Sequence, residues 1–314
     1  MNPFPKNEGT NQDDSFGSSY FFGSGAILVV IAAILWSTGG VLIKSVSLDA
    51  FQISFWRSFF AIATILIIYK PNSISSDKVT IFGSLAFAST LILFVLATKF
   101  TTAANAILLQ YTAPIYILIL SPFLLHEKPT VWQMLTITIC FIGMGIFFFE
   151  GISKEGFYGN VFALLSGISF ALMTILLRKK KDERPIDVIL LGSGWIVIIC
   201  SSVVMWQASF NPKGLLHEDV YMGFAISTAD SIMVLALGVF QIGIPYLLFS
   251  KGIKTVKALD ASLIGMLEPV LNPILVILFV GEKPSINAII GGAIILIAVF
   301  LQSLLASLRK VQDV

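Results

Sequence analysis

The sequence predicts an all-α integral membrane protein in which about ten transmembrane helices form two inverted five-helix repeats. Three observations lead to this class. The 314 residues are 56% hydrophobic and only 12% charged, about half the charged share of a soluble domain. The apolar residues gather in blocks of about 20, which is long enough to cross the hydrocarbon core of a bilayer as a helix. Two segments of the first half of the chain recur in the second half.

The apolar blocks are separated by short polar breaks such as "HEKPT" and "GEKPS". Membrane β-strands would be about ten residues long and would alternate apolar with polar side chains, whereas these runs are longer and do not alternate. We therefore expect helices, which satisfy their backbone hydrogen bonds internally. The predicted spans are 24–44, 50–69, 80–98, 102–125, 131–149, 157–178, 186–206, 231–250, 258–280 and 286–307.

Lysine and arginine set the predicted orientation. With the N-terminus in the cytoplasm, 14 of the 20 basic residues face the cytoplasm, 5 face outside, and Arg57 lies inside a span. This distribution follows the positive-inside rule. We therefore predict a multi-pass protein of the bacterial inner membrane with both termini cytoplasmic. Residues 1–23 are expected to form a disordered cytoplasmic tail, and residues 308–314 a short cytoplasmic C-terminal tail.

The repeat is visible in two pairs of segments. "AILLQYTAPIYILILSPFLLHEKPT" at 106–130 aligns with "ASLIGMLEPVLNPILVILFVGEKPS" at 261–285 after a shift of 155 residues. "GAILVVIAAILWSTGGVLIK" at 25–44 aligns with "GNVFALLSGISFALMTILLR" at 159–178. A duplicated unit with an odd number of spans must insert in opposite orientations, as in the inverted repeats of many secondary transporters.

These boundaries divide the chain into a first five-helix repeat at 24–149 and a second at 157–307. The two halves, together with "ILWSTGGVLIK", "FWRSFFA" and the two proline-to-Glu-Lys-Pro segments, resemble the drug/metabolite transporter superfamily, in its EamA-like family. The resemblance covers nearly the whole chain from residue 24. Proteins of this kind move amino acids, nucleotide sugars, nucleosides, S-adenosylmethionine or drugs, so the resemblance implies a transporter without implying one substrate.

Glu268 is the exceptional residue, because it lies in the middle of its predicted span, where a charge is costly unless it is hydrated or paired. Asn272 follows one turn later on the same face, and the matched position in the first repeat is Ala113. Glu268 could contact a cationic group, carry a proton, or be a protonated side chain that bonds between helices. The "EPV" string also resembles members with different substrates, which favours a structural or gating role over substrate choice.

Three further residues in the spans have both a structural and a functional interpretation. Arg57 could extend toward the membrane surface or bind a substrate carboxylate with both arms of its guanidinium. Pro114 and Pro269 each free the carbonyl four residues earlier, so they are candidates for gating kinks beside a cavity. Proline is also simply tolerated in membrane helices.

Aromatic and amide side chains away from the helix ends indicate a cavity that could hold a planar or apolar ligand. Each of them could instead face lipid or a neighbouring helix. Trp36 and Phe170 occupy matched positions of the two repeats. Glu127 and Glu282 lie at turns between helices. Each is expected close to the first turn of the next helix, where the helix dipole favours an anion, and neither is placed in the site. The predicted substrate-binding residues are Trp36, Arg57, Gln110, Tyr111, Phe170, Gln241, Tyr246, Glu268 and Asn272.

No catalytic set, cofactor motif or metal-ligand spacing is present in the sequence, and no Walker loop indicates ATP as a direct energy source. Cys140 and Cys200 are expected to be small buried residues. The expected partners are a small-molecule substrate and membrane lipid, with no nucleic acid; a proton or counter-substrate, and a monomer or homodimer, remain open. The main hypothesis is a secondary transporter of an amino acid or an amino-acid-like or nucleoside-like compound. The alternatives are a membrane enzyme and a ligand sensor or scaffold.

Overall fold

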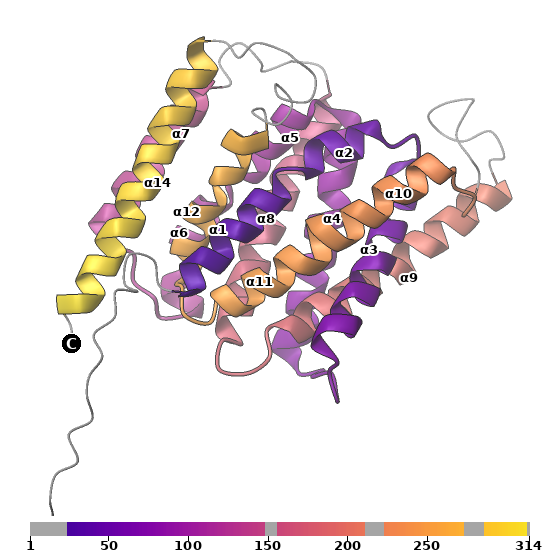
Figure 1. The fold of residues 1–314 in the computed structure, drawn as a ribbon, viewed down its shortest axis with the longest axis horizontal. Helices are drawn as coiled ribbons and strands as arrows, with labels where there is room; N and C mark the ends of the chain where they lie inside the picture. Colours follow the sequence, from indigo (N-terminus) through magenta and orange to yellow (C-terminus); the bar gives the residue numbers. More distant parts are fainter. Residues whose placement is uncertain (1–23, 148–155, 211–222, 273–285, 313–314) are drawn as a thin grey trace, which may run out of the picture.

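The computed structural model describes residues 24–147, 156–210, 223–272 and 286–312, and every regular element in those ranges is a helix (Figure 1). A further helical stretch, which Figure 1 does not label, covers 267–272. The all-α class is therefore confirmed. The labelled elements are α1 (Ser24–Trp36), α2 (Gly39–Ser45), α3 (Ala50–Tyr69), α4 (Lys78–Phe100), α5 (Ala103–Gln110), α6 (Ala113–Leu124), α7 (Val131–Phe147), α8 (Phe157–Lys179), α9 (Ile186–Phe210), α10 (Thr228–Ala236), the π-helix η1 (Leu237–Gly243), α11 (Ile244–Gly252), α12 (Ala258–Gly265) and α14 (Ile286–Gln312).

Within the described residues, seven helical segments are long and apolar enough to cross a membrane, and α7 and α14 carry shorter apolar stretches. Large apolar side chains are exposed on these helices, among them Phe123, Phe157 and Ile67, each at least 70% exposed. Such a surface is suited to lipid rather than water. The protein is therefore a multi-pass membrane protein. The later part of the predicted ninth span, from residue 273, lies outside the described residues.

Several helices begin at a polar side chain that accepts hydrogen bonds from the first turn. Asp49 accepts from the N–H groups of Phe51 and Gln52, and the Gln52 side chain accepts in return from the Asp49 N–H, which makes a capping box at the start of α3. The Asp77 side chain accepts from the first turn of α4, and that of Ser227 from the first turn of α10. These caps fix where the spans begin, because the first N–H groups of a helix have no partner inside it.

The duplication seen in the sequence is also present in the helix boundaries. A shift of 155 residues carries α5 onto α12 from end to end. Each is an eight-residue helix, and each is followed by a break and a second helical segment, α6 in one case and residues 267–272 in the other. Different local sequences, each with a proline at the matched position, have thus produced the same broken helix in both repeats.

The helices that carry the cavity lie in the middle of the molecule, with α4 packed along α8 and α1 along α11 (Figure 1). At one edge, α7 and α14 run side by side. Gly143 allows this contact, since a Cβ at that position would lie 2.9 Å from a side-chain carbon of Ile295. Cys140 and Cys200 are free and buried, as expected.

The basic loop that follows α8 is folded against the protein. Lys180 is 3% exposed and donates to Asp77 at 2.7 Å and to Glu183. The hydrogen bond from Lys180, together with those from Ser75 and Thr80, holds the pKa of the Asp77 carboxyl well below its usual range. Lys180 of this basic loop is therefore engaged in contacts within the protein. The positive charge of the loop also predicts that it lies on the cytoplasmic side.

Candidate functional site

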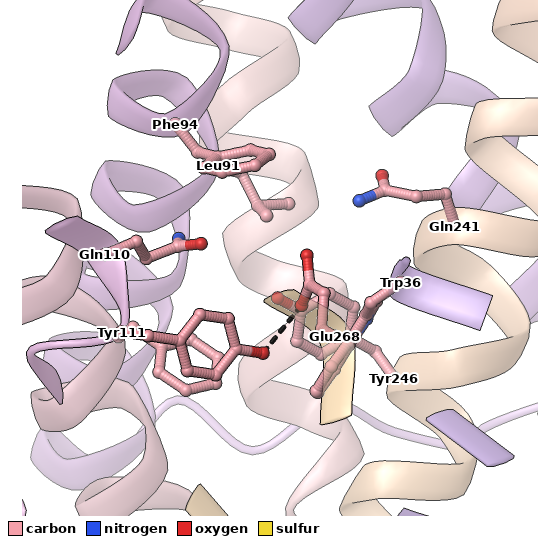
Figure 2. A pocket seen from close by; sticks show the side chains of 9 residues that line it. Trp36, Leu91, Phe94, Gln110, Tyr111, Gln241, Tyr246 and Glu268 are labelled. Carbon is pink, nitrogen blue, oxygen red and sulfur yellow. Dashed lines mark hydrogen bonds between the residues drawn. The ribbon is translucent and has the colours of Figure 1, made fainter. Parts of the chain in front are cut away.

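A small cavity lies where the helices of the two repeats are interrupted (Figure 2). Trp36 is the last residue of α1, just before a break, and Gln241 belongs to the π-helix η1. Gln110 and Tyr111 lie at the break between α5 and α6, and Glu268 comes just after the break that follows α12. Interrupted helices at the repeat interface form the substrate and ion sites of many transporters. The lining side chains are Trp36, Leu91, Phe94, Gln110, Tyr111, Phe170, Gln241, Tyr246 and Glu268.

Two of the breaks follow from proline. A proline removes one helical hydrogen bond and its ring clashes with the carbonyl four residues earlier. Pro114 is preceded at that distance by Gln110, the last residue of α5, and Pro269 by Gly265, the last residue of α12. The two prolines thus coincide with complete breaks where the sequence predicted kinks. Gly167 of α8 makes room for the freed Gln110 carbonyl, since a Cβ there would lie 2.7 Å from its oxygen.

The Glu268 carboxylate is held by Tyr111, whose hydroxyl donates to Glu268 Oε2 at 2.7 Å (Figure 2). Both side chains are almost fully buried. The two residues belong to different repeats and come from the matched broken helices. The hydrogen bond satisfies one carboxylate oxygen, which lowers the cost of placing this polar group within the membrane.

Aromatic rings form the rest of the wall. The Trp36 ring centroid lies 6.1 Å from that of Phe170, with the two planes nearly perpendicular, and 5.0 Å from that of Tyr246. The ring centroid of Tyr111 lies 6.5 Å from that of Phe170. The matched residues Trp36 and Phe170 therefore meet at the interface between the repeats. Such a ring cluster offers large apolar contact area and π-faces that attract cations.

Two amide side chains face the cavity from opposite walls (Figure 2). Gln110 donates from Nε2 to Ser166 Oγ at 2.8 Å. Gln241 accepts at Oε1 from the Arg57 guanidinium at a long 3.4 Å. Each amide therefore has one end bonded to the protein behind it.

The cavity is contracted in this conformation. Its volume is about 20 Å³, which is room for about one water molecule. Contacts between the repeats join them at both ends of the helices. Arg178 pairs with Glu127 at 2.7 Å at one end, and at the other the Ser47 N–H and hydroxyl donate to Asp230 at 3.0 and 2.5 Å. An organic ligand would therefore require the cavity to widen.

Seven of the nine predicted substrate-binding residues line this cavity. The other two lie behind its wall. Arg57 is fully buried against Gln241 and the Leu91 carbonyl, and Asn272 packs onto Gly40, where a Cβ would lie 2.6 Å from Nδ2. Sequence reasoning missed Leu91 and Phe94 because apolar residues in a regular helix carry no polar signal. The repeat could have revealed Leu91, since a shift of 155 residues carries it onto the predicted residue Tyr246.

Glu127 was predicted to sit near the first turn of the helix that follows it. The structure places its carboxylate instead at the start of α12, where the N–H of Ala258 donates to Oε2 at 3.3 Å. It also pairs with Arg178. Tertiary packing has thus brought a different helix N-terminus to this anion, with the same favourable dipole. Glu282 lies outside the described residues, and within those ranges no group of three His, Cys, Asp or Glu side chains could hold a metal ion.

The EamA-like transporter family model matches residues 23–149 and, a second time, residues 157–304. The chain belongs to the EamA-like transporter family. An uncharacterized transporter of Archaeoglobus fulgidus is 28% identical to this EamA-like chain, over 88% of the chain and 95% of the relative. An S-adenosylmethionine uptake transporter of Rickettsia prowazekii is 21% identical, over 79% and 81%. A solved crystal structure at 20% identity has the same fold, with a TM-score of 0.71 over 90% of this chain and 98% of that one.

Proposed function

We propose that this EamA-like protein is a secondary transporter that moves a small organic metabolite with a cationic group across the bacterial inner membrane. The observation that carries the proposal is the buried Glu268 carboxylate, held by Tyr111 in an aromatic cavity at the breaks of both repeats. A carboxylate placed at this depth has a large desolvation cost, which a bound cation offsets. The family and the transporter names of its relatives support the general activity.

The chemistry of the cavity wall narrows the substrate class. Trp36, Phe170 and Tyr246 offer ring faces, and Glu268 offers a negative charge among them. This combination suits an ammonium or sulfonium group on a body with apolar or planar parts. S-adenosylmethionine and amino acids with large side chains both fit this description. The name of the Rickettsia relative, an S-adenosylmethionine uptake transporter, agrees with the first of these.

Alternating access is the proposed mechanism. The two repeats enclose the cavity between contacts at each end, Arg178 with Glu127 and Ser47 with Asp230. Rocking of one repeat against the other would break one contact while the other holds. Substrate would then reach Glu268 from one side of the membrane at a time, after the breaks in the helices allow the contracted cavity to widen.

Uptake into liposomes that contain only this protein tests the proposal. We expect saturable accumulation of labelled S-adenosylmethionine or of an amino acid from a panel, and we expect Glu268→Gln to reduce it at least about tenfold because the charge is lost and the shape kept. Glu183→Gln is the matched control, since Glu183 lies in the loop after α8, away from the cavity. Chemical conversion of a probe without accumulation would indicate an enzyme instead, and equal uptake by Glu268→Gln would remove Glu268 from the mechanism.

A further inference from the structure

We infer that Arg57 and Ser166 fix the orientation of the Gln241 and Gln110 amides. The cavity then presents a donor on one wall and acceptors on the other. With this arrangement it selects a zwitterion. The substrate would carry a carboxylate that faces Gln241 and an ammonium that faces Gln110 and Glu268. This inference deepens the proposed function and rests on it. Simple cations would be excluded as substrates, and Arg57 and Ser166 would determine this specificity from behind the cavity wall.

Gln241 is oriented by Arg57. The guanidinium donates from NH1 to Gln241 Oε1 at 3.4 Å and from NH2 to the Leu91 carbonyl at 2.8 Å. Arginine has five donors and no acceptor, so the amide must turn its oxygen toward Arg57. The Gln241 nitrogen then faces the other way, and Figure 2 shows it directed into the cavity. Gly39 leaves room for this amide, since a Cβ there would lie 2.8 Å from Nε2.

Gln110 is oriented in the opposite sense by Ser166. The Ser166 hydroxyl donates to the Thr90 carbonyl at 2.9 Å, and a hydroxyl has only one proton to donate. Ser166 can therefore only accept from Gln110, whose Nε2 lies 2.8 Å away. This leaves the Gln110 oxygen free to face the cavity, as Figure 2 shows. The single proton of the Ser166 hydroxyl therefore decides the orientation of the Gln110 amide.

Two buried charges accompany the amides, the Arg57 guanidinium and the Glu268 carboxylate. Arg57 is fully buried and makes none of the ion pairs found among the described residues, and its positive charge lies behind the Gln241 donor. Glu268 places a negative charge at the end of the Tyr111 hydroxyl, and Tyr111 follows Gln110 in the chain. An α-amino acid group presents one charge to each of these sites. A simple amine would leave the Arg57 side without a counter-charge, which is costly in a buried site.

Matched pairs of compounds that differ only in the carboxylate test this inference. The pairs are S-adenosylmethionine with its decarboxylated form, arginine with agmatine, phenylalanine with phenethylamine, and tryptophan with tryptamine. Dissociation constants are measured on the purified full-length protein in detergent by titration calorimetry. We expect the amino acid of the preferred pair to bind at least about tenfold more tightly than its amine, because a charge-assisted hydrogen bond is gained.

Gln241→Glu is the decisive variant, because it keeps an oxygen for Arg57 and removes the cavity-facing NH₂. We expect the preference for the carboxylate to disappear while the amine binds at least as well as before. Ser166→Ala should weaken both members of the pair alike, because the Gln110 amide becomes free to turn. Gln207→Glu on α9 is a control outside the cavity lining and should leave the preference unchanged.

Three results would overturn the inference: no preference for the amino acid in the parent, a preference that survives in Gln241→Glu, or no binding by any of the eight compounds. In the first two cases the proposed transport of a cationic metabolite still stands, because amines bind or the preference has another source. In the third case, uptake of some other cation by the liposomes would keep the proposed function and reject the zwitterion. Loss of all uptake would reject both.

Discussion

The Nε atom of Arg178 lies 2.7 Å from Oε1 of Glu127, and this ion pair joins the last turn of α8 in the second repeat to the turn after α6 in the first. Arg178 also donates to the carbonyls of Ile253 and Lys254 at 2.9 and 2.7 Å. The pair therefore holds three segments together at the end of the molecule that the charge distribution places in the cytoplasm. Removing one partner of such a largely buried pair leaves an uncompensated charge, so the pair opposes separation of the repeats at this end.

A different contact joins the repeats at the opposite end. Asp230, in the first turn of α10, accepts from the N–H and the hydroxyl of Ser47. Lys44 occupies the position in the first repeat that matches Arg178 in the second, and it donates to the Thr101 carbonyl at 2.8 Å. Each end thus carries one of two matched basic residues, Lys44 or Arg178. Among the described residues, the contact that joins the repeats differs between the ends, since Arg178 pairs with Glu127 at one end and Ser47 donates to Asp230 at the other.

Weakening either contact should open the cavity on one side only. We expect Glu127→Gln to expose the cavity to the cytoplasm and Ser47→Ala to expose it to the outside. The reporter is Phe94→Cys in a protein whose two native cysteines are replaced by alanine. Labelling by a membrane-impermeant maleimide is followed in inside-out and right-side-out vesicles. If the free-energy difference between the inward-open and outward-open conformations changes by at least about 1.4 kcal/mol, labelling from the favoured side becomes about tenfold faster.

Each of these two variants is the control for the other. If both speed labelling from the same side, or if neither changes its sidedness, the contacts do not act as opposed closures. A charge reversal that combines Glu127→Arg with Arg178→Glu should restore slow labelling from the cytoplasmic side, because it restores the ion pair.

Tyr111→Phe should weaken binding of a cationic substrate without unfolding the protein. The substitution removes the donor that lies 2.7 Å from Glu268 and leaves the ring in place against Phe170. A buried group that loses its partner costs about 1–3 kcal/mol, so we expect the dissociation constant to rise about tenfold. Tyr158→Phe, at an exposed site at the start of α8, serves as the control. Unchanged binding in Tyr111→Phe would show that Glu268 is positioned without this hydrogen bond.

Trp36 and Phe170 should contribute to binding through their ring faces. Full truncation of a buried aromatic residue can cost about 3–5 kcal/mol of stability, so Phe170→Leu and Trp36→Phe are the informative changes. We expect weaker binding with normal amounts of folded protein in the membrane, judged by size-exclusion chromatography in detergent. Poor folding combined with unchanged affinity would assign both rings to packing alone.

The inverted arrangement makes a topological prediction. A reporter fused after residue 184 and one at the C-terminus should both be active in the cytoplasm, whereas one at residue 213 should be active outside. The activities of a phosphatase and a fluorescent protein at each site measure this directly. An external C-terminus would contradict the proposed orientation of the two repeats.

Much of this protein follows from its sequence, because the bilayer restricts the possible structures. Apolar runs of about 20 residues can only be helices there, and the repeated segments predict two copies of one helical unit. The side chains that line the cavity were also largely predictable, because polar and large aromatic residues in mid-span are costly unless they share a protected site. The positions of Pro114 and Pro269 even indicate which carbonyls end the first half-helices.

Tertiary structure alone decided which partners these residues meet. Glu127 accepts from the first turn of α12, more than a hundred residues away, and Arg57 lies behind Gln241 rather than in the cavity. The structure also decided the sense in which each amide faces the cavity, through Ser166 and Arg57. The physical reason is that a hydrogen bond depends on the position of one atom to within a few tenths of an ångström. Helical periodicity assigns a face to each residue, but only the packing of the two repeats places a donor opposite its acceptor.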